Sequence, residues 1–235
     1  MTSTLALEVK GLQAWYGESH VLHGIDIEVN KGECVSLLGR NGAGRTSTLR
    51  AILGLTSRRA GLVKILGRDV MSLKTHQIAR LGVGYCPEER AIYASLSCEE
   101  NLLLPPVLRP GGMPLEEIYE LFPNLKERRK SQGTRLSGGE QQMLAMARIL
   151  RTGADILFLD EISEGLAPVI VEKLAQVIAT LKERGYTILL VEQNFEFAAE
   201  LAERLYVIEH GKVVSHIPAS DIASKHDELK ELLGI

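Results

Sequence analysis

Long hydrophobic runs are missing from this sequence of 235 residues. Apolar runs such as residues 156–159 and 188–191 are strand-sized and far short of the ~20 apolar residues that a membrane-spanning helix needs. The first residues, 1–10, also lack the charged start and the long apolar stretch of a signal peptide. We therefore expect a soluble chain in the cytoplasm.

Paired cysteines and an excess of basic charge are missing as well. Cys34, Cys86 and Cys98 form no CxxC pair, and their odd number argues against both a disulfide framework and a zinc site. With 27 Lys and Arg residues against 30 Asp and Glu residues, the formal charge is −3, so the chain has no overall basic field for nucleic acid.

The 45% of hydrophobic residues can fill the core of one large domain or two small ones, which excludes a disordered chain.

The period of the apolar residues changes along the chain and indicates two kinds of sheet. Residues 7–9 and 25–29 alternate apolar and polar side chains, which predicts a half-exposed antiparallel β-meander. Short, mostly apolar strands at residues 34–38, 156–159 and 187–191 are instead typical of a parallel α/β sheet. Polar residues follow each of these strands at the carboxyl end, where open α/β sheets bind their ligands.

A helical insertion is predicted between about residues 99 and 151, because strand patterns disappear there. Proline and glycine break this segment into short pieces at Pro105, Pro106, Pro110, Gly111, Gly112 and Pro114. The chain shows no internal repeat, heptad array or low-complexity tract. These patterns predict an α/β fold that carries a helical subdomain.

A glycine-rich phosphate-binding loop, or P-loop, follows the predicted strand at residues 34–38. Its residues are Gly39, Arg40, Asn41, Gly42, Ala43, Gly44, Arg45, Thr46 and Ser47. Such a loop surrounds a phosphate chain with backbone N–H groups at a helix N-terminus, and the Thr46 hydroxyl is placed to bind Mg²⁺. Arg45 replaces the expected lysine, keeping the charge on a longer, planar head group. For this segment alone, a strand-to-helix turn without a ligand is the alternative.

Two adjacent carboxylates, Asp160 and Glu161, end the predicted strand at residues 156–159. In P-loop hydrolases Asp160 would hold Mg²⁺, while Glu161 would polarise the attacking water. A solvated turn is the alternative for the pair alone, but the P-loop upstream favours a nucleotide site. The sequence contains no Asn-Lys-x-Asp motif for guanine, so a GTPase is excluded.

The segment LSGGEQQ, residues 136–142, precedes a predicted helix. Ser137 and Glu140 have the spacing of a capping box, so an ordinary amphipathic helix could begin this way. Combined with the P-loop and the acidic strand end, however, the segment resembles the signature loop of ATP-binding cassette (ABC) ATPases. The resemblance implies that Ser137, Gly138, Gly139 and Glu140 bind the ATP held by a second subunit, because a hydroxyl and backbone amides at a helix N-terminus form an anion site.

Three further positions resemble ATP-contacting positions of the ABC family. Tyr16 corresponds to the aromatic residue that stacks on adenine, and an ordinary strand aromatic is the alternative. Glu88 stands where most cassettes have a glutamine that senses Mg²⁺ and the membrane partner. Gln193 stands where most have a histidine at the γ-phosphate. Glutamate and glutamine at these two positions are similar to the smaller ATPase of branched-chain amino-acid importers.

The loop around Ser163 departs from that subfamily. Ile162 and Glu164 stand where its members have proline and leucine in their inter-subunit loop.

The resemblance implies a single ABC ATPase domain over residues 1–235. An antiparallel β-region would cover about residues 1–33 and 60–70, the helical subdomain about 99–151, and a RecA-like P-loop core the remainder. The implied activity is hydrolysis of ATP with Mg²⁺ to drive import. Its implied catalytic residues are Glu161, Gln193 and Arg45, and its implied metal ligands are Thr46, Asp160 and Glu88.

The implied partners are transmembrane permease subunits, a second ATPase subunit that is identical or different, and, indirectly, a periplasmic substrate-binding protein. The chain would then lie on the inner face of the cell membrane and bind no nucleic acid. One alternative is a regulatory or scaffold subunit that binds ATP but hydrolyses little of it because of Arg45. The other is the ATPase of a transporter for another substrate, such as urea or other amino acids, or of an exporter. A chromosome-organising cassette is excluded because the chain has no long coiled coil.

Overall fold

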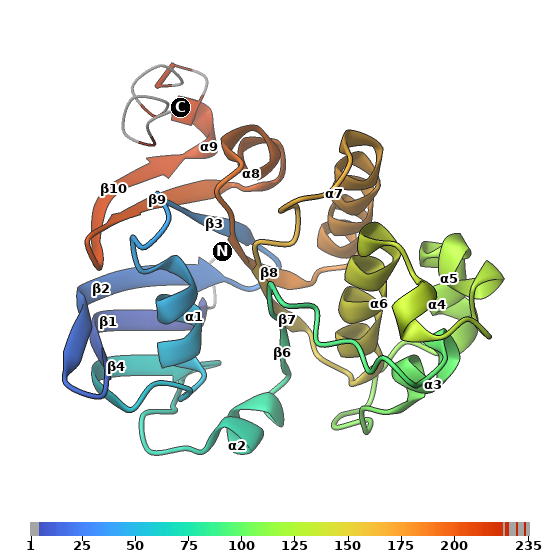
Figure 1. The fold of residues 1–235 in the computed structure, drawn as a ribbon. Helices are drawn as coiled ribbons and strands as arrows, with labels where there is room; N and C mark the ends of the chain where they lie inside the picture. The colour runs from blue at the N-terminus through green and yellow to red at the C-terminus, as the bar shows by residue number, and fades with distance from the viewer. Residues whose placement is uncertain (1–4, 223, 226–228, 230–232, 234–235) are drawn as a thin grey trace.

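Two sheets of different strand direction organise the part of the chain that the structure, a computed structural model, describes, namely residues 5–222, 224–225, 229 and 233 (Figure 1). The first sheet is antiparallel, with the order β2-β1-β4-β5. Its strands are β1 (Leu5–Tyr16), β2 (Ser19–Asn30), β4 (Arg58–Ile65) and β5 (Arg68–Asp69). The predicted alternation of buried and exposed residues is confirmed in β2. The predicted meander is wrong, because β2 leads into the other sheet and β4 returns to the far side of β1.

The second sheet has the order β10-β9-β3-β8-β7-β6 and forms the core. Its strands are β3 (Cys34–Leu38), β6 (Val83–Cys86), β7 (Ile156–Asp160), β8 (Thr187–Val191), β9 (Arg204–Glu209) and β10 (Lys212–Pro218). All neighbours are parallel except the hairpin β9–β10, which the sequence analysis did not predict. Every residue of β3, β7 and β8 is buried, because both faces of a parallel sheet are covered.

Helices α6 (Gly138–Arg151), α7 (Pro168–Glu183) and α8 (Phe195–Leu201) pack against the core sheet on the face away from the antiparallel sheet. Helices α3 (Cys98–Leu103), α4 (Leu115–Leu121) and α5 (Pro123–Glu127) lie further out and pack with α6 (Figure 1). Helix α2 (Thr75–Ala79) packs beside β6, α9 (Ala219–Ile222) packs beside β10, and α1 (Arg45–Ile52) packs between the two sheets (Figure 1). The described chain between β6 and β7 contains helices and no strand, as expected of a helical insertion.

The two faces of β3 belong to two different hydrophobic clusters. Cys34 and Leu38 pack with residues of α6, α7 and α8, whereas Val35 and Leu37 pack with α1 and the antiparallel sheet. This division follows from the strand period of two. It places α1 and α6 on opposite faces of the core sheet.

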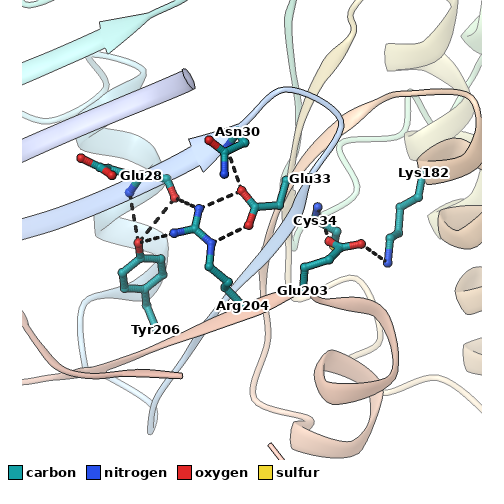
Figure 2. A network of polar contacts seen from close by, with 8 residues as sticks. All are labelled: Glu28, Asn30, Glu33, Cys34, Lys182, Glu203, Arg204 and Tyr206. Carbon is teal, nitrogen blue, oxygen red and sulfur yellow. Dashed lines mark hydrogen bonds and ion pairs between the residues drawn. The ribbon is translucent and has the colours of Figure 1, made fainter. Parts of the chain in front are cut away.

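A polar network fixes the amino-terminal edge of β3 (Figure 2). Arg204 of β9 donates from Nη2 to the Glu28 carbonyl and to Glu33 Oε2, both at 2.7 Å. Glu203 Oε2 accepts from the Cys34 backbone N–H at 2.7 Å and so holds the first residue of the strand. These bonds tie the connection between β2 and β3 to β9, and they set where β3 begins.

Arg59 fixes the C-terminal end of α1. Its Nη1 donates to the carbonyls of Ala51 and Ile52 at 2.6 and 2.8 Å, and its Nη2 donates to Val70 O at 2.7 Å. The last carbonyls of a helix have no partner within it, and the guanidinium supplies the donor for the Ile52 carbonyl. The Ala51 and Val70 carbonyls also accept from the N–H groups of Gly54 and Leu73, both at 3.1 Å, so there the guanidinium adds a second bond. Because α1 begins at the predicted P-loop, Arg59 stabilises the same helix at the opposite end.

We expect Arg59→Met to lower the free energy of unfolding by about 1–3 kcal/mol, because it leaves the Ile52 carbonyl without its donor and removes one of the two bonds to each of the Ala51 and Val70 carbonyls. Urea denaturation monitored by circular dichroism measures this change. Arg68→Met, at an exposed position of β5, is the matched control and should change stability by no more than about 0.5 kcal/mol. Equal effects of the two substitutions would contradict the capping role of Arg59.

Candidate functional site

The loop between β3 and α1 has the backbone of a phosphate-binding loop. Gly42 and Gly44 adopt φ of 80° and 111°, in the left-handed region that favours glycine, and Gly44 is the N-cap of α1. A Cβ on Gly39 would lie 2.3 Å from the Ile208 carbonyl oxygen, so that position also requires glycine. A cavity is lined by Val21, by residues 40–47 and by Glu161. The structure therefore brings most of the predicted P-loop residues and one of the two predicted carboxylates to one cavity.

Thr46 and Asp160 lie close enough together for both to bind one Mg²⁺. Thr46 Oγ1 donates to Asp160 Oδ1 at 2.9 Å, and Tyr85 donates from its hydroxyl to Asp160 Oδ2 at 2.9 Å. Asp160 is fully buried, and this burial raises the pKa of its carboxyl, although the two hydrogen bonds oppose the rise. No group of three or more His, Cys, Asp or Glu residues suited to a metal occurs among the described residues. Two hard oxygen donors still fit Mg²⁺, because it is usually held by one or two carboxylates together with substrate phosphates and water.

Arg45 and Glu161, both predicted to be catalytic, are paired with each other. Arg45 Nη2 lies 2.6 Å from Glu161 Oε1 and 3.3 Å from Asn41 Oδ1. The arginine side chain is only 3% exposed, and its Nη1 is buried with no hydrogen-bond partner among the described residues. Glu161 itself has φ of 48°, a left-handed conformation that is uncommon for a residue other than glycine. Phosphate binding by Arg45 stays a prediction.

Gln193 and Glu88 follow strands at the same carboxyl edge of the core sheet. Gln193 comes after β8 and is exposed, and Glu88 comes after β6 and is also exposed. Since β6 pairs with β7, Glu88 lies one strand away from Asp160. Neither residue lines the cavity at the P-loop. Their roles at the γ-phosphate and at Mg²⁺ stay predictions.

The predicted signature loop begins α6 with a complete capping box. Ser137 Oγ accepts from the Glu140 backbone N–H at 3.3 Å, and Glu140 Oε2 accepts from the Ser137 N–H at 2.7 Å. Ser137 is exposed, Gly138 half-buried and Gly139 buried. The loop does not line the cavity at the P-loop, because α6 and α1 lie on opposite faces of the core sheet (Figure 1). Whether these residues also bind ATP stays a prediction.

Tyr16 ends β1 and is 36% exposed. Its neighbour Trp15 is stacked between the His20 ring, at 4.2 Å, and the Arg58 guanidinium, at 4.1 Å. Tyr16 does not line the cavity at the P-loop, so adenine stacking by Tyr16 stays a prediction.

Two residues of this region were missed by the sequence analysis. Tyr85 binds Asp160, and Glu192 is a buried carboxyl whose pKa is raised to about 7 by its burial. A signal for Glu192 was present, because it follows directly after the apolar run at residues 188–191.

Comparisons with known proteins agree with this geometry. The family model described as ABC transporter matches residues 22–164, more than half of the chain. The branched-chain amino-acid transport ATP-binding protein BraG of Pseudomonas aeruginosa is 38% identical over 87% of this chain and 89% of its own length. The lipopolysaccharide export ATP-binding protein LptB of Haemophilus influenzae is 32% identical over 89% of each chain.

The fold has close counterparts among solved structures. A nucleotide-free ATP-binding cassette from an ABC transporter superposes with a TM-score of 0.84, at 22% identity, over 98% of this chain and 99% of that one. The expected P-loop ABC ATPase fold is thereby confirmed. The chain belongs to the ABC transporter family and is an ATP-binding subunit with the ATPase activity of that family.

Proposed function

We propose that this chain drives the import of branched-chain amino acids by hydrolysing ATP with Mg²⁺. The observation that carries the hydrolytic part is the 2.9 Å contact between Thr46 and Asp160 at the P-loop, with Glu161 lining the same cavity. The substrate class is supported by the similarity to BraG, at 38% identity. The similarity to LptB, at 32%, favours an export subunit as the second candidate. Purification of the chain with its partners from the native membrane, followed by leucine uptake assays in vesicles, tests the substrate.

The residues would divide the chemistry as follows. Backbone N–H groups of residues 41–46 and the Arg45 guanidinium bind the phosphates of ATP. Thr46, Asp160 and Glu88 would hold Mg²⁺, which when bound neutralises charge on the phosphates. Glu161 accepts a proton from the attacking water, and Gln193 lies at the γ-phosphate.

The proposed partners are inferred from the separation of the two predicted ATP-binding loops and from exposed apolar side chains. The P-loop and the signature loop lie at opposite faces, so a second ATPase subunit, identical or different, would bring its signature loop to this P-loop. Exposed apolar side chains lie between β6 and α4, where permease subunits would dock: Tyr93, Leu103, Leu104, Val107 and Leu108. No described helix is both long enough and apolar enough to cross a bilayer, so the proposed place on the inner face of the membrane depends on those permeases. A periplasmic substrate-binding protein would act only through them, and no nucleic acid takes part.

We expect Glu161→Gln to reduce ATP turnover by at least about 10²-fold, because the variant keeps the shape of the side chain but removes the base. ATP should then stay bound and hold two ATPase subunits together. Size-exclusion chromatography with ATP and Mg²⁺ measures the dimer, and the wild-type chain under the same conditions is the control. Monomer alone, in the presence of every candidate partner subunit, would contradict the two-subunit site.

We expect Gly138→Asp to abolish turnover while ATP still binds to the P-loop of the same chain, because a carboxylate would repel the γ-phosphate held by the second subunit. A Cβ on Gly138 would lie 3.1 Å from Nη1 of the flexible Arg90 side chain, so the substitution can be accommodated. Gly138→Asn has the same shape without the charge and is the matched control. If Gly138→Asp is folded and fully active, Ser137–Gly139 act only as a helix cap, whose loss costs about 0.5–2 kcal/mol of stability.

We expect Arg45→Lys to raise turnover more than it tightens ATP binding. The guanidinium is bonded to Glu161 and leaves Nη1 without a partner, whereas the lysine of other P-loops is a compact charge for the phosphates. A misplacement of about 1 Å at the transferring group can cost on the order of 10²-fold in rate. Steady-state ATPase assays with ATP titration and partner subunits measure both quantities. Equal or lower turnover in Arg45→Lys would show a loop adapted to arginine, and wild-type turnover too low to measure would favour a regulatory subunit.

A further inference from the structure

A buried carboxylate, Glu192, lies where three loops at the carboxyl edge of the core sheet meet. Its side chain is only 1% exposed. Its backbone N–H donates at 3.2 Å to the carbonyl of Leu37, which lies two residues before the P-loop. The carbonyl of the preceding residue, Val191, accepts at 2.8 Å from the N–H of Glu161. The backbone at residues 191–192 is therefore bonded both to the strand that enters the P-loop and to the residue proposed as the base.

Both oxygens of the Glu192 carboxylate accept hydrogen bonds from Ser163. The Ser163 backbone N–H donates to Oε1 at 3.1 Å, and its hydroxyl donates to Oε2 at 2.7 Å. Ser163 is itself only 7% exposed, so both bonds are shielded from water. A low local dielectric strengthens such shielded hydrogen bonds.

The turn over residues 161–163 needs such support because of its backbone. Glu161 has φ of 48°, and a residue other than glycine keeps this strained conformation only where its surroundings hold it there. The turn is fixed at one end by the bond from Glu161 to Val191 and at the other by the two bonds from Ser163 to Glu192. Removing the second support frees the turn to relax and to move the Glu161 carboxylate.

We propose that Glu192 is a positioning residue that holds the Glu161 carboxylate in place, relative to the P-loop and to Gln193, by binding Ser163. This inference rests on the proposed role of Glu161 as the base. Glu192 contacts neither nucleotide nor water in this role and acts only through the turn. Because the P-loop N–H groups belong to other residues, losing Glu192 should slow the chemical step and leave ATP binding unchanged.

The central experiment compares Glu192→Met with Glu192→Gln in steady-state ATPase assays with partner subunits. Methionine fills a similar volume but accepts no hydrogen bond of comparable strength, so we expect kcat to fall by about tenfold or more, with the KM for ATP within about threefold of wild type. In Glu192→Gln, the amide oxygen can accept from the Ser163 N–H while the amide nitrogen donates to the hydroxyl. This conservative variant should recover at least about a third of the wild-type kcat.

A matched control is available at the other end of the same strand. Thr187, the first residue of β8, is 4% exposed, and its Oγ1 accepts from the Gly32 backbone N–H at 3.0 Å. Thr187→Val therefore also leaves a backbone N–H without its acceptor, but at the amino edge of the sheet, away from Glu161. We expect this variant to lose stability in thermal unfolding and to keep the wild-type kcat.

The outcomes separate this inference from the proposed function. A folded Glu192→Met with wild-type kcat overturns the inference, and so does a Thr187→Val whose kcat falls as far. If Glu192→Met does not fold, Ser163→Ala decides: a lower kcat at unchanged KM supports the inference, and an unchanged kcat overturns it. If Glu161→Gln keeps full turnover, the proposed role of Glu161 fails first. Loss of turnover in Glu161→Gln with full turnover in Glu192→Met overturns the positioning role alone.

Discussion

The parallel register of β3, β8 and β7 is the constraint on which the site depends. In this register Leu37 lies beside Val191, and Val191 beside Asp160, so the three strands reach the carboxyl edge of the sheet in one row. The next residues along the strands lead into the P-loop, into Glu192 and into Glu161. A slip of one residue in any pair would turn each side chain to the opposite face, which the two hydrophobic clusters on either side of the sheet forbid. Core packing therefore aligns the P-loop with Glu161 and Glu192, which lie more than a hundred residues further along the chain.

The sequence predicted the parts of this arrangement that follow from local pattern. Three mostly apolar strands and the glycines at Gly42 and Gly44 have local signatures, and the structure confirms both. The contact between Arg45 and Glu161 could not be predicted, because it joins residues far apart in the chain and depends on how a guanidinium fits a small space. The strand β10 was missed because it is an edge strand with a weak apolar pattern. A local signal for β9 was present in the apolar run at residues 205–208, all of them buried, but the sequence analysis did not use it.

The pair of Arg45 and Glu161 has consequences for energy as well as for chemistry. Both side chains are largely removed from water, so desolvation offsets most of their mutual attraction, and the pair adds little net stability. Losing one partner is different, because the other charge is then buried without compensation. An incoming phosphate group can replace the carboxylate as the partner of Arg45, since it too offers anionic oxygens to a planar donor. The residue proposed as the base is thus paired with the residue proposed to bind the phosphates.

The opposite placement of α1 and α6 explains why one copy of this chain cannot surround a nucleotide. Each helix has a different core cluster beneath it, so neither N-terminus can turn toward the other without breaking the packing of the core sheet. The capping box of Ser137 and Glu140 holds the start of α6 rigid within its own subunit. If the start of α6 binds ATP as proposed, it would therefore bind the nucleotide held by a second subunit. Under that proposal, hydrolysis and subunit pairing would be linked by the same core packing that sets the strand register.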